Sequence, residues 1–197
     1  MTENFASAGV FLIQTFFGIY FILIMVRFLM QVSKVDYYNP LCQGIIKITN
    51  PAIKPLSKLI PTVRGIDFAT LTAGFLVEMI LIVLVMWLKY DLLIYPIYIA
   101  WVLVIMFSVI LKIYFFALII MVISSWIAPY STHPAMTLIH QLTEPLCTPA
   151  RKLLPPMGGI DFSIILVFVV ITLIDNYLIV RPLIETLGIP GSLMPGS

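Results

Sequence analysis

One segment occurs twice in this chain, at a constant offset of 94 residues and without a gap. Residues 40–68 read PLCQGIIKITNPAIKPLSKLIPTVRGIDF, and residues 134–162 read PAMTLIHQLTEPLCTPARKLLPPMGGIDF. Twelve of the 29 aligned positions are identical, among them four prolines and the shared ending Gly-Ile-Asp-Phe. Chance alone gives far fewer identities, so the chain contains an internal duplication. Its fold has to be assembled from two copies of one unit.

The rest of the sequence is mostly apolar. Of the 197 residues, 61% are hydrophobic and 10% are charged, and the mean hydropathy is +1.11. A soluble domain carries about 25% charged residues, so this chain cannot cover itself with a water-compatible surface. We therefore predict an all-α integral membrane protein. The net charge is +2 and no long basic tract occurs, so direct nucleic-acid binding is not expected.

Apolar stretches long enough to cross a bilayer lie at residues 5–31, 68–88, 97–128 and 162–180. The apolar region between residues 91 and 130 raises the alternative of two spans there, and five in total, but it has no turn signal around Lys112. Adding the offset to the first span also places its counterpart inside this region. We predict four spans in two repeats, residues 1–90 and 91–183, followed by a flexible tail at residues 184–197.

The charges of the two loops predict their side of the membrane. Four spans make the repeats parallel, with both loops on one face, whereas five would make them inverted. The loop at residues 32–67 carries five basic residues, and the loop at residues 129–161 carries Arg151 and Lys152. Basic loops stay in the cytoplasm. Both loops are therefore predicted to be cytoplasmic, with both termini outside.

Each loop contains an amphipathic stripe. Apolar residues recur there at three- and four-residue spacing beside basic residues such as Lys58 and Lys152. Such a helix either lies flat in the membrane interface, near anionic headgroups, or packs on the protein's own spans. Both interpretations stay open. Thr49-Asn50-Pro51 and Thr143-Glu144-Pro145 look like starts of new helices with a capping threonine, so we expect these prolines, with Pro55 and Pro149, to kink the segment and cut it into pieces.

Asp67 and Asp161 each stand directly before the next apolar run. An aspartate in that position caps a helix by accepting from free amides of the first turn. The alternative is that the two pseudo-symmetric carboxylates flank a central site for an ion or a partner.

Three charged residues fall within the predicted spans: Glu78, Lys112 and Asp175. At 1.5 Å per residue they lie roughly 15, 24 and 20 Å from the cytoplasmic side. Such residues normally pair or line water. Depth favours an ion pair between Lys112 and Asp175, with Glu78 as the second choice for a partner; a polar conduction or proton path is the alternative. Arg27, near the end of the first span, is expected to reach headgroups.

The sequence offers no signature of catalysis. Cys42 and Cys147 stand alone, without the paired spacing of a metal or covalent haem site. No nucleophile–base pair or Gly-rich phosphate loop appears. We therefore expect a non-enzymatic protein without a cofactor.

The run LTEPLCTPARKLLPPMGGIDFS, residues 142–163, resembles the YggT family of small bacterial inner-membrane proteins, and the duplication makes the chain resemble a tandem member related to the YlmG group. The resemblance implies a multi-pass inner-membrane protein without catalytic residues, linked to osmotic or potassium-related stress tolerance. Plastid and cyanobacterial relatives imply the alternative, a scaffold or assembly factor for a membrane complex or for division and nucleoid organisation. Expected partners are the bilayer with its anionic headgroups, and a second copy or another membrane protein.

The first copy departs from the family pattern at three charged positions. Asn50 stands where the second copy has Glu144, Ser57 where it has Arg151, and Arg64 where it has Gly158. If Glu144 and Arg151 pair or bind a ligand, the first copy cannot do the same. The two halves are therefore predicted to be non-equivalent.

Overall fold

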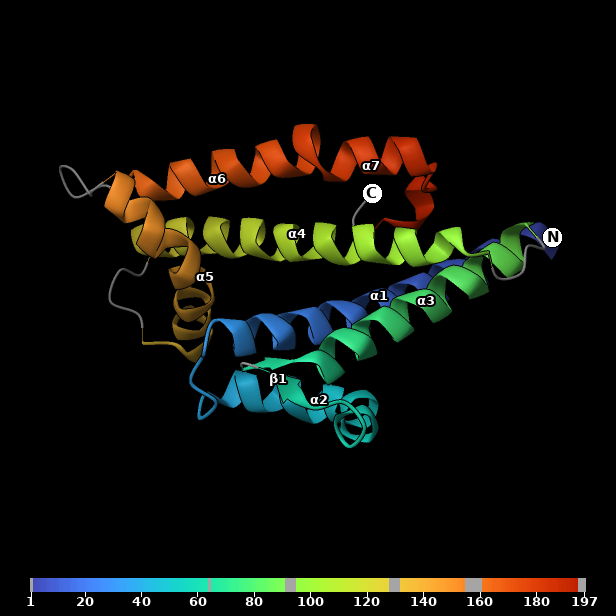
Figure 1. Ribbon diagram of the computed structural model, residues 1–197, viewed down its shortest axis with the longest axis horizontal. Coiled ribbons are helices and arrows are strands. Elements are labelled where there is room, and N and C mark those ends of the chain that lie inside the picture. The colour runs from blue at the N-terminus through green and yellow to red at the C-terminus, as the bar shows by residue number, and fades with distance from the viewer. Residues whose placement is uncertain (1, 64, 91–94, 128–131, 155–160, 195–197) are drawn as a thin grey trace.

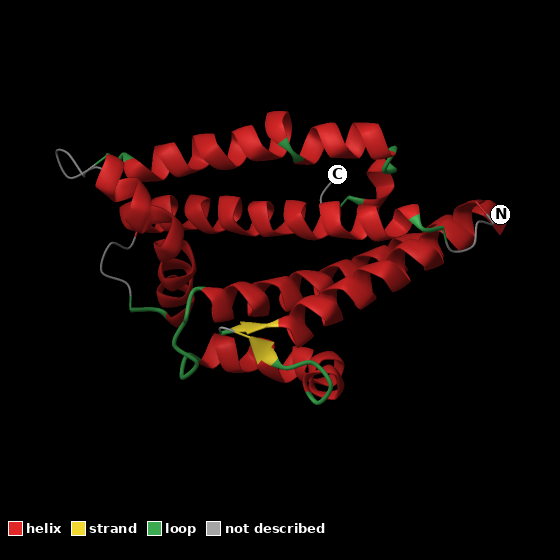
Figure 2. Cartoon of the chain, in the orientation of Figure 1, coloured by secondary structure: helices red, strands yellow, loops and turns green. Residues whose placement is uncertain are grey.

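A computed structural model describes residues 2–63, 65–90, 95–127, 132–154 and 161–194, with side chains from residue 8 onward. Helices dominate these residues (Figure 2). Among the described residues, four helical segments are long and apolar enough to cross a membrane: Ala8–Val32, Phe68–Tyr90, Ile97–Ile127 and Ser163–Leu187. The protein is thus a multi-pass membrane protein of the all-α class. The third segment is a single helix, so the prediction of one long span there is confirmed.

The spans belong to α1 (Thr2–Val32), α3 (Phe68–Tyr90), α4 (Ile97–Ile127) and a composite last span. That last span comprises α6 (Ser163–Leu173), the π-helical turn η1 (Ile174–Leu178) and α7 (Val180–Leu187). Helix α1 packs mainly on α3, both contact α4, and α4 packs against α6 and α7 (Figure 1). Each repeat therefore contributes a pair of neighbouring spans.

Helices α2 (Pro40–Ser57) and α5 (Pro134–Leu153) lie at the end of the bundle where α1 and α4 finish and α3 and α6 begin (Figure 1). Both start with proline after a capping side chain: Asn39 Oδ1 accepts from Leu41 N at 2.9 Å, and His133 Nδ1 accepts from Ala135 N at 3.2 Å. Proline suits the first helical position because its missing N–H would have no partner there.

Each of these two segments is one helix, so the prediction that prolines cut them into pieces is wrong. Pro51 and Pro55 lie inside α2, and Pro145 and Pro149 lie inside α5. The reason is tertiary packing, which contributes more to helix stability than local propensity does. The packed face of α2 buries Cys42, Thr49 and Ile53, and that of α5 buries Leu138, Leu142, Thr143, Cys147 and Ala150. A kink at these prolines stays a prediction.

The packed faces also bear on the amphipathic stripe. Helix α2 contacts α1 and α3, and α5 contacts α4 and α6, so packing on the protein's own spans is realised. Leu41 and Ile48 of α2 remain exposed outside the packed face. Contact with the membrane interface stays a prediction for that remaining surface.

The segment after α1 fastens the first repeat to the second. Ser33 Oγ donates to Leu142 O at 3.3 Å, the backbone N–H of Asp36 donates to Gln141 Oε1 at 3.1 Å, and Asn39 Nδ2 donates to Pro134 O at 2.7 Å. All three acceptors belong to α5. The two repeats are therefore joined by polar contacts as well as by apolar packing.

A short hairpin leads from α2 into α3. Strands β1 (Thr62–Val63) and β2 (Ile66–Asp67) pair antiparallel, with Thr62 opposite Asp67. Gly65 turns the chain with φ +82°, a left-handed conformation that side chains with a Cβ rarely adopt. Arg64, and Gly158 and Gly159 of the second copy, lie outside the described residues.

Residues 184–194, predicted as part of a flexible tail, pack against the bundle instead. Helix α7 contacts α4, and Trp101 Nε1 donates to Leu187 O at 3.1 Å. Gly188 ends α7 in the left-handed conformation, φ +63°, which turns the chain back. Ile189 and Leu193 are then buried, so apolar packing holds this segment.

Candidate functional site

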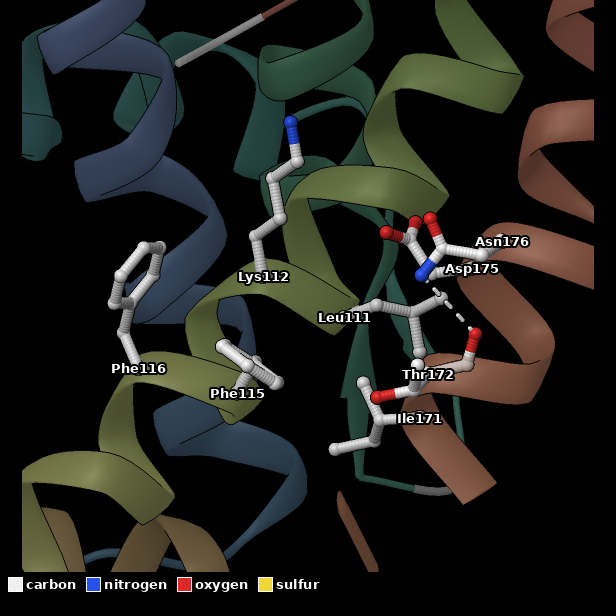
Figure 3. A pocket seen from close by; sticks show the side chains of 8 residues that line it. All are labelled: Leu111, Lys112, Phe115, Phe116, Ile171, Thr172, Asp175 and Asn176. Carbon is white, nitrogen blue, oxygen red and sulfur yellow. Dashed lines mark hydrogen bonds between the residues drawn. The ribbon is translucent and has the colours of Figure 1, made fainter. Parts of the chain in front are cut away.

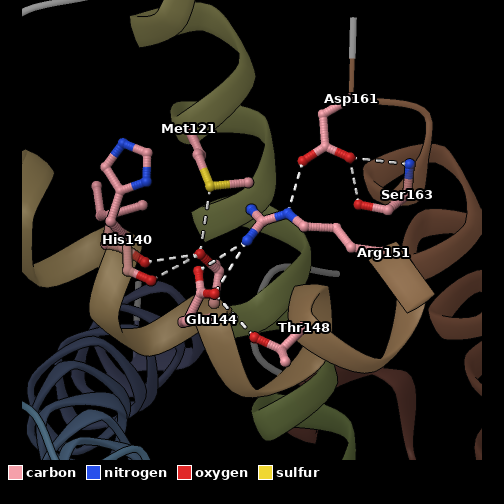
Figure 4. A network of polar contacts seen from close by, with 9 residues as sticks. Met121, His140, Glu144, Thr148, Arg151, Asp161 and Ser163 are labelled. Carbon is pink, nitrogen blue, oxygen red and sulfur yellow. Dashed lines mark hydrogen bonds and ion pairs between the residues drawn. The ribbon is translucent and has the colours of Figure 1, made fainter. Parts of the chain in front are cut away.

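In the second repeat, the Arg151 guanidinium joins α5 to the start of α6 (Figure 4). Its Nη1 lies 2.9 Å from Glu144 Oε1, and its Nε lies 2.9 Å from Asp161 Oδ2. Asp161 Oδ1 accepts from the backbone N–H of Ser163 at 3.1 Å and also from the Ser163 hydroxyl. Thr148 Oγ1 donates to Glu144 Oε1 at 2.8 Å. The predicted candidates Glu144, Arg151 and Asp161 thus form one connected network.

These contacts hold the network in its charged form. The Thr148 hydroxyl, together with Arg151, lowers the pKa of Glu144. Partial burial acts to raise the pKa of Asp161, but hydrogen bonds from Ser163 and Arg151 outweigh it and the pKa falls below its usual value. The hydrogen bond to Asp161 contributes most to raising the pKa of Arg151. One cation therefore faces two carboxylates at neutral pH.

The first repeat places a guanidinium at the matching position from another helix. Arg27 of α1 donates through Nη1 to Thr49 Oγ1 at 2.9 Å, to Asn50 Oδ1 at 3.0 Å and to Ile46 O at 3.2 Å, all in α2. Arg27 was expected to reach headgroups; its Nη1 contacts polar atoms of α2, and headgroup contact by the rest of the guanidinium stays a prediction. Met121 occupies the position equivalent to Arg27 in the second repeat, where it accepts from Thr143 Oγ1 at 3.3 Å.

Asp67 makes the contacts of a helix cap. Its Oδ1 accepts from Ala69 N at 3.0 Å, and its Oδ2 accepts from Thr70 Oγ1 at 2.8 Å and from Gln31 Nε2 at 3.3 Å. Asp161 accepts in the same way from the N–H two residues further on. The two carboxylates do not meet at a common site. Asp67 lines a cavity of about 500 Å³ in the first repeat, and Asp161 lines one of about 510 Å³ in the second.

Lys58 and Lys152 lie exposed at the ends of α2 and α5. A cation there complements the negative end of the helix dipole. Neither lysine belongs to the Arg151 network, whose ion pairs are Arg151–Glu144 and Arg151–Asp161.

Lys112 and Asp175 line one cavity of about 320 Å³ between α4 and the last span (Figure 3). The two residues that depth suggested as partners thus line the same cavity, and the ion pair between them stays a prediction. Asp175 lies in η1, and π-helical turns occur often at functional sites. Asp175 Oδ1 is buried and has no hydrogen-bond partner among the described residues. Lys112 also lines an apolar cavity with Ile22 and Val26 of α1.

Glu78, the second choice as a partner of Lys112, lies elsewhere. It is 1% exposed and lines a cavity of about 400 Å³ that Lys112 does not line. Neither of its carboxylate oxygens has a hydrogen-bond partner among the described residues. Among the described residues, no three His, Cys, Asp or Glu side chains lie close enough together to hold a metal ion. Cys42 and Cys147 are buried free thiols.

Two tandem matches to a protein-family model decide the classification. The CCB3/YggT model matches residues 6–88 and again residues 100–182, so each match covers one repeat with both spans and the helix between them. The chain belongs to the CCB3/YggT family. The resemblance found in the sequence motif is thereby confirmed.

Several bacterial proteins match most of the chain. The uncharacterized protein PA0392 of Pseudomonas aeruginosa is 40% identical over 195 residues, covering 95% of this chain and 95% of its own length. The uncharacterized protein YggT of Escherichia coli K12 is 34% identical over 187 residues, covering 94% and 95%. A Vibrio alginolyticus protein described as uncharacterized is 32% identical over 167 residues, covering 81% and 86%. No solved structure matches this chain.

Several participants in the polar networks of the two repeats were not predicted from the sequence. Gln31, Thr49 and Ser163 were not among the candidates, although each contacts one of the charged residues. Thr49 and Thr143 lie inside their helices and are not the caps that the sequence predicts, because each hydroxyl donates within its own helix, to Ile45 O at 2.7 Å and Ile139 O at 2.9 Å. The sequence did contain a signal for this threonine: both copies have it, although the next residue differs between them, Asn50 in the first and Glu144 in the second.

Proposed function

We propose that this CCB3/YggT protein is a non-enzymatic protein of the bacterial inner membrane that supports tolerance of ionic and osmotic stress. One observation carries the proposal: Glu78, Lys112 and Asp175, all within the spans, each line a cavity. A charged residue at this depth costs about 2.5–3.5 kcal/mol on insertion scales. A protein that only spans the membrane does not require charged residues at this depth. Ionisable residues beside intramembrane cavities favour a role in handling ions.

The sidedness in this proposal has both α2 and α5 in the cytoplasm. Exposed Lys58 and Lys152 at the ends of these helices support it, since basic residues favour the cytoplasmic face and its anionic headgroups. Cysteine substitutions at Lys58 and Lys152 test it directly. A membrane-impermeant thiol reagent should label both in inside-out vesicles and neither in intact spheroplasts.

The functional test uses Asp175→Asn and Lys112→Leu, expressed at the level of the wild type in a strain lacking the protein. We expect the wild type to restore growth after osmotic upshift and to alter ion flux in proteoliposomes, and both variants to lose these effects. Glu185→Gln is the matched control, because Glu185 is exposed and pairs with Arg181 at the surface. Full activity of Asp175→Asn and Lys112→Leu would count against ion handling at this cavity.

A scaffold or assembly role is the second candidate. The observation that favours it is the surface left beside the packed face of α2, which includes Ile48, Lys54 and Lys58. A helix that is anchored on one side can present the other to a membrane-protein partner or a second copy. Cross-linking in native membranes should then trap a defined product that Lys54→Glu/Lys58→Glu removes. An unchanged cross-linking pattern would argue against this role.

A further inference from the structure

The cavity beside Glu78 lies between α1, the middle of α3 and the packed C-terminal segment. Its volume is about 400 Å³. The polar residues that line it are Gln14 and Thr15 of α1, Glu78 of α3, and Ser192 of the C-terminal segment. The remaining lining residues are apolar or glycine, so Glu78 is the one titratable side chain among those that line the cavity.

No described residue donates a hydrogen bond to the Glu78 carboxylate. The residue is 1% exposed, and both oxygens are buried without a hydrogen-bond partner in the described part of the chain. A buried carboxylate is very costly when charged and alone, so it has to acquire either a proton or a cation. Arg27 and Lys112 do not line this cavity, and none of the described residues that line it is basic.

Three further residues that line the same cavity carry neutral oxygen atoms. Gln14 Nε2 donates to Ser192 O at 2.6 Å, which leaves the Gln14 amide oxygen as an acceptor. The Thr15 hydroxyl donates to Phe11 O at 2.8 Å, and its lone pairs remain acceptors. Carboxylate, amide and hydroxyl oxygens are ligands for hard cations. A single carboxylate neutralises one positive charge, so this set favours a monovalent ion over a divalent one.

We propose that Glu78 is the anionic ligand of a binding site for one alkali-metal cation, with Gln14, Thr15 and Ser192 supplying neutral oxygen ligands. The cation displaces the proton that Glu78 otherwise carries. Thr172 occupies the position equivalent to Glu78 in the second repeat, so the site belongs to the first repeat only. The inference deepens the proposed function and rests on it for its physiological meaning, but cation binding can be measured without any assay of transport or growth.

Thermal unfolding of the purified full-length protein in detergent tests the site. Potassium chloride or sodium chloride replaces choline chloride at constant ionic strength. A cation that binds only the folded state raises Tm once its concentration exceeds the dissociation constant, because it adds about 4 kcal/mol to the free energy of unfolding at a thousandfold excess. We expect a saturating rise for the wild type and for the surface control Glu185→Gln, and none for Glu78→Gln. A flat series for the wild type contradicts the proposal.

Labelling of the wild-type protein with a hydrophobic carbodiimide provides a second readout, which holds even if Glu78→Gln does not fold. These reagents modify protonated carboxyl groups in apolar surroundings, and peptide mass spectrometry locates the adduct. We expect modification of Glu78 in choline chloride and at least a fivefold reduction in saturating alkali-metal chloride. Equal labelling in both salts overturns the site. An absence of labelling also overturns it when the thermal series of the wild type is flat. Binding without any flux or growth effect would instead overturn the proposed function and leave the site intact.

Discussion

Arg27 and Arg151 each donate to the side chain at the same position of their repeat, although they come from different helices. Arg27 of α1 contacts Asn50, and Arg151 of α5 contacts the equivalent Glu144. In the first repeat the position of Arg151 is held by Ser57, and in the second the position of Arg27 is held by Met121. Each repeat has thus kept a guanidinium at this junction while changing the helix that provides it.

Arg151→Gln should destabilise the second repeat. The substitution removes the ion pairs to Glu144 and Asp161, which lie half in solvent and are therefore screened. We expect a loss of about 1 kcal/mol, at the upper end for exposed ion pairs. Thermal unfolding in detergent measures it, with Ser57→Gln as the control at the equivalent position. An equal Tm for wild type and Arg151→Gln would show that the network contributes nothing to stability.

Asn50→Glu should stabilise the protein when Arg27 is present and destabilise it when Arg27 is replaced. In the wild type it places a carboxylate beside Arg27 Nη1, now 3.0 Å from Asn50 Oδ1, and a charge-assisted hydrogen bond is about twice as strong as a neutral one. We expect a higher Tm. In an Arg27→Met background the same substitution leaves the carboxylate without its cation, and we expect a lower Tm. A double-mutant cycle with no coupling would contradict the assignment of this contact.

Acid should weaken the Arg151 network of the second repeat. The folded-state pKa values of Asp161 and Glu144 lie below their ordinary values, so both residues contribute stability that is fully present above the unfolded pKa. That contribution is lost as the pH falls through the lowered folded values, that is, below about pH 4. Asp161→Asn keeps a capping oxygen but removes the titration. Its Tm should therefore fall less between pH 5 and pH 3 than that of the wild type, measured by differential scanning fluorimetry.

Gly74 should tolerate alanine but not leucine. A Cβ built at this position of α3 meets the flexible end of Met25, with Ile24 and Phe21 of α1 at 3.5 and 3.6 Å. Small residues allow membrane helices to approach closely. Met25 can move for a methyl group, so Gly74→Ala should shift Tm little, whereas Gly74→Leu should separate α1 from α3 and abolish the folded monomer peak in size-exclusion chromatography. Gly18→Leu, with nothing within 4 Å of the added Cβ, is the control.

The apolar lengths and the repeat offset were enough to predict the spans. A bilayer sets the minimum apolar length of a span, and the offset relates the spans of one repeat to those of the other. The same offset could not reveal that Arg27 contacts Thr49 and Asn50. That contact joins two helices whose relative rotation depends on packing, and the paired position in the other copy is Met121. Prolines such as Pro51 predicted interruption from local chemistry alone, and burial of Thr49 and Ile53 outweighed it.

The C-terminal segment shows the same limit. Its composition gave no sign that Trp101, more than eighty positions earlier, would bind Leu187 O, or that Leu193 would be buried against the spans. Glu78 and Gln14 were visible as polar residues in apolar stretches, but only the folded arrangement places both beside Ser192.

The hydrogen bonds from Ser33, Asp36 and Asn39 to α5 have a consequence for how such a protein arises. A chain with the first repeat alone has these donors but lacks α5, so it needs a second chain to provide the same acceptors. Joining two repeats in one polypeptide replaces that encounter with an intramolecular one, whose effective concentration is set by the linker and not by expression level. Once the halves no longer have to recognise identical copies, each is free to change its own charges, as Asn50 and Glu144 have done.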